Sequence, residues 1–162
     1  MDTFDRNELL KGDEEFFLRF CKVEHYKDTG PGGQKRNKTA SAVRVTHKDS
    51  GVFATAADDR QQSINKIRAI RNLRFNIACE IRREASVWDG AWGMSTKNHD
   101  YAGFVAVLLD AMEKFDYQVS SVGEFFTKST GQIIKTLAKD DHLWQFVNQQ
   151  RQKRQLKPLK KK

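Results

Sequence analysis

A short glycine- and proline-rich segment constrains the fold of this chain more than any other feature. Asp28-Thr29-Gly30-Pro31-Gly32-Gly33-Gln34 cannot form a regular helix or strand, because glycine is conformationally free and Pro31 lacks a backbone N–H. Before this segment, Cys21, Val23 and His25 alternate with other residues, which predicts a strand that leads into the loop. The loop is therefore expected to follow a strand.

The pattern after the loop predicts a hairpin and a long helix. Ala42–His47 alternates apolar and polar residues as a half-buried strand does, and Asp49-Ser50-Gly51 has the composition of a turn before a partner strand, Val52–Ala56. A helix is expected over Arg60–Arg83, capped by Asp58 or Asp59. Its predicted apolar stripe is Ile64, Ile67, Ile70 or alternatively Ala69, Leu73, Ile77 and Ile81.

The second half of the chain reads as helical. Tyr101–Phe115 is apolar on a helical period, and Asp140 or Asp141 can cap a last helix. Two stretches, Ser121–Glu124 and Ser129–Gln132, match the capping-box pattern at a helix start. We therefore predict an α+β fold, in which a small mixed-strand domain with one long packed helix precedes an all-α module and a basic tail. The predicted boundaries are 1–85 for the first domain, 86–99 for a linker, 100–150 for the helical module and 151–162 for the tail.

The positive charge is concentrated in two regions. The chain carries 29 Lys and Arg against 21 Asp and Glu, a formal net charge of +8. Residues 60–84 and 151–162 are strongly basic, whereas residues 1–30 and 85–150 are mildly acidic. Clustered cations attract polyanions, of which nucleic acid is the commonest. Two alternatives stay open: the tail only keeps the chain in solution, and the arginines of the predicted helix only form a solvated face.

Several function classes are disfavoured by composition. No apolar run approaches the roughly 18–20 residues that span a bilayer, and the acidic start lacks the order of a signal peptide. Cys21 and Cys79 are far apart, and the four histidines are scattered without metal-ligand spacing. We therefore expect a cytoplasmic protein that contacts no membrane and needs no metal or other cofactor.

The loop and its surroundings resemble a known family. The segment from about Phe16 to Arg83 is similar to the peptidyl-tRNA hydrolysis domain of class I peptide chain release factors. The resemblance is carried, in the family's order and spacing, by Gly30, Gly32, Gly33, Gln34, Asn37, Lys38 and Thr39, then Ser41, Val43, Arg44 and His47, then Arg60, Gln61 and Asn65.

The resemblance implies a catalytic role for Gly32, Gly33 and Gln34. In the family, this loop enters the peptidyl transferase centre and promotes the attack of water on the ester between peptide and tRNA. The backbone N–H of Gln34 would stabilise the developing oxyanion, while its side chain shapes the water site. The implied partners are the ribosome, through its rRNA, and the peptidyl-tRNA in the P site, with the protein acting as a monomer. Expected RNA-binding residues are Lys35, Arg36, Asn37, Lys38, Thr39, Arg44 and Arg60, and in the tail Arg151, Lys153, Arg154, Lys157, Lys160, Lys161 and Lys162.

Codon-reading members of the family carry a separate domain with a stop-codon recognition tripeptide. Nothing in 100–162 resembles the P-x-T or S-P-F type of reader, and only about 15 residues precede the first predicted strand. The chain therefore looks closest to the small codon-independent rescue hydrolases of this superfamily, whose basic tail lies in the mRNA channel of a stalled ribosome. The predicted function is ribosome-dependent hydrolysis of peptidyl-tRNA during rescue.

One departure from the family pattern supports a second hypothesis. Lys35-Arg36 stands where the family usually has a His-Val-like pair, which puts the efficiency of hydrolysis in question. The alternative is a ribosome- or RNA-binding quality-control module with weak or no hydrolysis. The helical module somewhat resembles a helix-turn-helix, but its acidic balance favours a simple bundle or a protein contact over a DNA reader.

Overall fold

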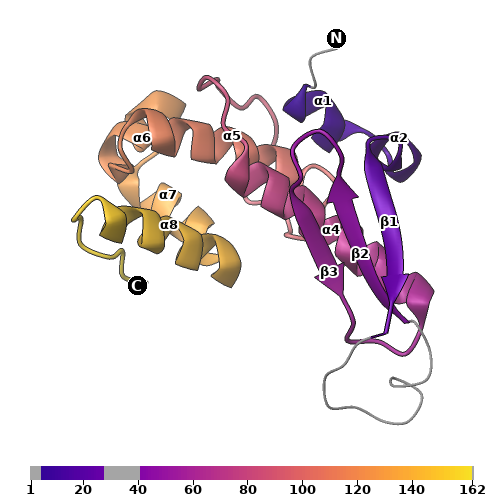
Figure 1. The fold of residues 1–162 in the computed structure, drawn as a ribbon. Helices are drawn as coiled ribbons and strands as arrows, with labels where there is room; N and C mark the ends of the chain where they lie inside the picture. The colour runs from indigo at the N-terminus through magenta and orange to yellow at the C-terminus, as the bar shows by residue number, and fades with distance from the viewer. Residues whose placement is uncertain (1–4, 28–40, 162) are drawn as a thin grey trace. The chain divides into compact units, whose positions relative to one another are not determined.

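A computed structural model describes residues 5–27 and 41–161 of the chain. The structure divides into two compact units, Met1–Glu80 and Ile81–Lys162. Figure 1 follows the chain from the N-terminal unit, which holds the sheet, into the helices of the second unit. The predicted α+β class is confirmed. Within the described residues, no helix has both the length and the apolar character that crossing a membrane requires.

The first unit contains a three-stranded sheet in the order β1-β2-β3, antiparallel throughout. The strands are β1 (Cys21–Tyr26), β2 (Ala42–His47) and β3 (Phe53–Ala56). The predicted strand over Ala42–His47 is confirmed residue for residue, while its partner begins one residue later than expected. Gly51 in the connecting turn has φ 76°, a left-handed conformation that glycine adopts without strain.

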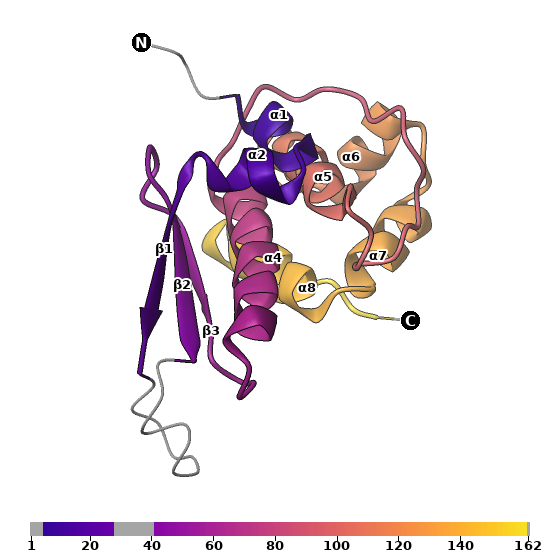
Figure 2. The same cartoon turned by 90° about the vertical axis from the view of Figure 1, so that its right-hand side faces the viewer.

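Helix α4 (Gln62–Glu80) covers one face of this sheet, as Figure 2 shows. It is shorter at both ends than the predicted Arg60–Arg83. The predicted stripe is right at Ile70, Leu73 and Ile77, which are buried, and wrong at Ile67, which is 52% exposed.

Two short helices that the sequence analysis did not anticipate precede the sheet. They are α1 (Arg6–Lys11) and α2 (Glu14–Leu18). Asp5 accepts the N–H groups of the first turn of α1, and Asp13 does the same for α2. Helices this short are unstable alone, so tertiary contacts must hold them in place.

Arg74 of α4 supplies such a contact from within the core. Its guanidinium donates to the carbonyl oxygens of Leu10 at 3.2 Å and Gly12 at 3.0 Å, and lies 4.3 Å from the ring centre of Phe17. Burial lowers the pKa of this arginine from its usual value. The Arg74 side chain thus connects both N-terminal helices to α4. The alternative that the arginines of this helix only form a solvated face does not hold for Arg74.

The second unit is helical. Its helices are α5 (Tyr101–Lys114), α6 (Val119–Phe126), α7 (Thr130–Ala138) and α8 (Asp141–Lys153). The capping box at Ser129 and the cap at Asp140 are both confirmed. The capping box predicted at Ser121 is wrong, because α6 starts at Val119 and places Ser121 inside the helix.

The segment between the sheet unit and α5 packs within the second unit. The ring centre of Phe104 in α5 lies 5.5 Å from that of Trp88 and 5.1 Å from that of Trp92. Asp110 of α5 accepts the backbone N–H of Arg83 at 2.9 Å and lies 3.2 Å from the guanidinium of Arg82. The segment between α4 and α5 is therefore packed against α5 close to the first residues of the second unit.

A glycine in α6 allows the close approach of the next connection. A Cβ at Gly123 would lie 2.6 Å from the carbonyl oxygen of Lys128, whereas a Cβ at Gly103 in α5 would meet no atom within 4 Å. We expect Gly123→Ala to destabilise the protein by about 1–3 kcal/mol through overpacking. Gly103→Ala should instead stabilise it by about 0.5–1 kcal/mol, because alanine favours the helix. Thermal unfolding of both variants checks this, and equal effects at the two positions would contradict it.

Candidate functional site

The predicted catalytic loop leaves and re-enters the sheet between two paired strands. Tyr26, the last residue of β1, is the antiparallel partner of Ala42, the first residue of β2. Gly32, Gly33 and Gln34 lie outside the described residues, as do the predicted RNA-binding residues Lys35, Arg36, Asn37, Lys38 and Thr39. The described part of the site is therefore the base from which this loop extends.

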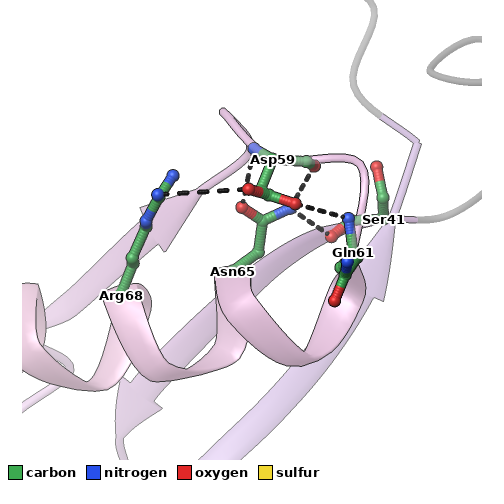
Figure 3. A network of polar contacts seen from close by, with 5 residues as sticks. All are labelled: Ser41, Asp59, Gln61, Asn65 and Arg68. Atoms are coloured by element: carbon green, nitrogen blue, oxygen red, sulfur yellow. Dashed lines mark hydrogen bonds and ion pairs between the residues drawn. The ribbon is translucent and has the colours of Figure 1, made fainter.

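A buried asparagine joins three parts of this base. Asn65 of α4 is fully buried, and its Nδ2 donates at 2.8 Å both to the carbonyl oxygen of Ser41 and to that of Asp59. Its Oδ1 accepts the backbone N–H of Asp59 at 3.1 Å. The Asp59 carboxylate accepts the N–H of Gln61 at 2.8 Å and lies 4.0 Å from the Arg68 guanidinium, completing the network in Figure 3. The Asn65 side chain thus joins the residue before β2 and the connection between β3 and α4 to the helix itself.

This network also explains where α4 begins. Asp59 bonds to the N–H of Gln61, the residue before the helix, so its carboxylate organises the turn that precedes α4. Arg60 lies in this turn and is exposed, as an RNA-binding residue must be. Of the two predicted capping residues, Asp59 therefore binds the backbone just before α4, and together with Asn65 it stabilises the turn there.

Arg44, the predicted RNA-binding residue of β2, is exposed and packs against aromatic rings. Its guanidinium carbon lies 5.5 Å from the ring centre of Tyr26 and 5.5 Å from that of Phe53. Both distances are within the range of cation–π attraction. Arg44 therefore has an ordered position on the surface of the sheet.

The predicted basic tail begins within the last turn of α8, and the residues after Lys153 fold back along this helix. Arg151 donates through Nη1 to the carbonyl oxygen of Tyr117 at 2.6 Å and through Nε to that of Lys157 at 2.9 Å. Farther along, the N–H of Leu159 donates to Oδ1 of Asn148 at 2.7 Å. Because Asn148 precedes Arg151 in α8, the segment runs back beside the helix from which it came.

Two other cations of this segment form ion pairs within the helical unit. Arg154 lies 3.1 Å from Glu113 and has its guanidinium carbon 4.5 Å from the ring centre of Tyr117. Lys161 forms an ion pair with Asp141 at 3.0 Å. Lys162 lies outside the described residues. The exposed lysines of the segment that take part in neither ion pair are Lys153, Lys157 and Lys160.

Burial shifts the pKa of two further side chains of the described sheet unit, Cys21 and His47. Burial raises the pKa of the Cys21 thiol to about 11, so the thiol stays protonated at neutral pH. Burial also lowers the pKa of His47, whose Nδ1 lies 2.6 Å from the Ser50 hydroxyl. Among the described residues, no three His, Cys, Asp or Glu side chains are grouped so that they could hold a metal ion.

One known protein family matches the part of the chain that holds the three strands and α4. Residues 19–95 match the family described as the RF-1 domain, a match that includes the strands, the predicted loop and α4. This stretch is similar to the RF-1 domain. The likeness to release factors inferred from the loop residues is thus confirmed for this part of the chain.

The chain is also similar in part to individual peptide chain release factors. Peptide chain release factor 1 of Leptothrix cholodnii is 43% identical over 70 residues, which are 43% of this chain and 19% of the relative. The corresponding factor of Chlamydia trachomatis is 40% identical over 81 residues, 48% of this chain and 23% of its own length. That of Exiguobacterium sibiricum is 43% identical over 63 residues, 39% of this chain and 18% of the relative. The chain thus spans about a fifth of the length of these relatives.

The network around Asn65 is the part of the site that sequence reasoning missed. The sequence analysis used Asn65 only as one of the residues that carry the family resemblance. A polar residue in the row of a helix that faces the core could have pointed to a buried hydrogen bond. Asn65 precedes Ala69 and Leu73 at intervals of four residues, and both of these are buried. A polar side chain in that row predicts a buried hydrogen-bond network.

Proposed function

We propose that this protein hydrolyses the ester bond of peptidyl-tRNA on the ribosome. The observation that carries the proposal is the RF-1 domain over residues 19–95, with Gly32-Gly33-Gln34 in the connection between two paired strands. RF-1 domain proteins catalyse ribosome-dependent peptidyl-tRNA hydrolysis. The pairing of Tyr26 with Ala42 and the bond from Asn65 to Ser41 give that connection a rigid base.

The proposed reaction requires no side chain that acts as an acid or a base. An ester is already an activated acyl group, so the protein must place a water molecule and stabilise the oxyanion that forms as water attacks. We assign the second task to the backbone N–H of Gln34 and the first to its side chain together with the RNA. Gly32 and Gly33 allow the backbone to approach crowded RNA, because they carry no Cβ. The proposed partners are therefore rRNA and the P-site peptidyl-tRNA, met by a cytoplasmic monomer.

We further propose that the reaction is independent of the codon. Lys153, Lys157 and Lys160 are exposed on the ordered C-terminal segment, where they can contact phosphates. Phosphate contacts position a protein on a nucleic acid without reading its sequence. Cations at this end of the chain and the RF-1 domain together suit the rescue of a stalled ribosome.

A second candidate function is ribosome binding in quality control with weak or no hydrolysis. It is favoured by Lys35-Arg36, which differs from the His-Val-like pair of the family beside the proposed catalytic residues. Two added cations alter the electrostatics of the loop. This candidate predicts ribosome binding without appreciable peptide release.

The test is peptide release from purified ribosomes that carry peptidyl-tRNA in the P site. Three complexes are compared: one on mRNA truncated after the P-site codon, one with a sense codon and one with a stop codon in the A site. We expect release on the truncated mRNA without any requirement for a stop codon, and none by Gly33→Ala although that variant still binds the ribosome. Release only at stop codons would exclude the rescue proposal, and unchanged release by Gly33→Ala would exclude the assigned loop. Binding without release by the wild type would support the second candidate.

A further inference from the structure

The open face of the sheet carries an arginine between two aromatic rings. Arg44 lies in the central strand β2, with Tyr26 of β1 on one side and Phe53 of β3 on the other. The guanidinium carbon is 5.5 Å from each ring centre. Phe53 is 54% exposed, so much of its ring remains accessible beside the guanidinium.

Strand alternation places this cluster on the face opposite α4. Val43 and Val45, the neighbours of Arg44 in β2, are fully buried, and Ala54 and Ala56 of β3 are buried as well. Because successive side chains point to opposite faces, Arg44 and Phe53 point away from the core. Figure 2 shows α4 along one side of the sheet only.

The charge of this face suits a polyanion. The acidic residue on the face beside Arg44 is its cross-strand partner Glu24, which lies 3.9 Å from Lys22. Lys27 and Lys48 are exposed at the ends of β1 and β2. Among the described residues that the strand register places on this face, two cations, Lys22 and Arg44, accompany the one carboxylate of Glu24.

We propose that Tyr26, Arg44 and Phe53 form a stacking platform for an unpaired nucleobase of RNA. A single exposed phenylalanine is ordinary on a protein surface, but a planar guanidinium ordered between two rings beside further cations matches the chemistry of a base and its phosphate. Aromatic side chains on an open sheet stack bases in a sequence-tolerant way. The three side chains span the sheet lengthwise, because Tyr26 lies opposite Ala42 at the start of β2 and Phe53 lies opposite Thr46 near its end. The inference rests on the proposed function in taking RNA as the partner.

The experiment measures the binding of a fluorescent single-stranded oligoadenylate and of an RNA duplex of equal length, over a series of salt concentrations. We expect Phe53→Ala to weaken single-strand binding by about 5- to 100-fold, the range for loss of one stacked base, with an unchanged salt slope. Phe53→Tyr should bind within about twofold of wild type, because its ring can still stack. Thr55→Ala, at an exposed position in the same strand, is the matched control and should match wild type. Thermal unfolding verifies that each variant is folded.

Several results would overturn the platform. Wild-type affinity in Phe53→Ala would do so, as would an equal loss for single-stranded RNA and duplex, since duplex bases are not free to stack. Weaker ribosome binding by Phe53→Ala with normal oligoadenylate binding would indicate a ribosomal protein contact instead. Because RNA binding is read without hydrolysis, an inactive wild type with Phe53-dependent binding would exclude the proposed function and leave the platform in place.

Discussion

Gln34→Pro should reduce peptide release by about 100- to 1,000-fold, the effect of removing one oxyanion donor. Proline removes the backbone N–H itself, which is the group that we propose stabilises the oxyanion. The measurement is the single-turnover release rate from ribosomes on truncated mRNA, at a protein concentration that saturates binding. Affinity for the ribosome should change far less than the rate, because the donor acts on the transition state.

The matched control for this prediction is Gln34→Ala. It removes the side chain and keeps the backbone N–H, so we expect a smaller loss of release rate than in Gln34→Pro. Equal losses in the two variants would show that the side chain, and not the N–H, makes the main contribution. Release by Gln34→Pro within a few-fold of wild type would refute the proposed oxyanion contact.

Asn65→Ala should destabilise the sheet unit by about 3 kcal/mol or more. The substitution leaves the carbonyl oxygens of Ser41 and Asp59 without the donor that now binds them, and a buried polar group left unsatisfied costs about 1–3 kcal/mol. For a unit of this size, such a loss lowers the melting temperature by about 12 °C or more. Calorimetry or circular dichroism on the full chain measures the shift.

Two variants test whether the network itself is responsible. Asn65→Asp keeps the shape but replaces the donating Nδ2 by an oxygen that faces two carbonyl oxygens, so we expect it to be at least as damaging as Asn65→Ala. Asn72→Ala is the control on the same helix, where an exposed asparagine makes one long 3.4 Å bond to the Thr55 carbonyl oxygen. Its melting temperature should shift by only a few degrees at most. A small shift in Asn65→Ala would contradict the assigned role.

The elements that could be predicted from sequence are those with a local cause. The strand Ala42–His47 follows from alternating valines, and the capping box at Ser129 follows from a serine three residues before a glutamine. The same pattern at Ser121 failed, because a capping box describes a helix start only when the chain before it is not already helical. Asp5 and Asp13 are typical N-cap residues of the two N-terminal helices. These helices are too short to show the helical spacing of apolar residues by which a helix is predicted.

The predicted RNA-binding residues that the structure describes differ in their surroundings. Arg44 and Arg60 are exposed, as RNA-binding residues must be, whereas Arg151, Arg154 and Lys161 make contacts within the helical unit. Charge counting cannot separate these groups, since it treats every lysine and arginine alike. The carboxylates and carbonyl oxygens that bind some of the cations come from distant parts of the chain.

The sequence by itself determined the α+β class, the order of strand, loop and hairpin, and the likeness to release factors, because these depend on periodicity, glycine and proline chemistry, and residue spacing. Only the tertiary structure decided which polar side chains hold the molecule together. Asn65 reaches Ser41 across 24 residues of sequence, and Arg74 reaches Leu10 across 64. A local pattern shows that a polar residue lies on a buried face, but its hydrogen-bond partner exists only after the chain has folded. The same reason applies to the basic C-terminal segment, whose charge is visible in the sequence and whose fold-back along α8 is not.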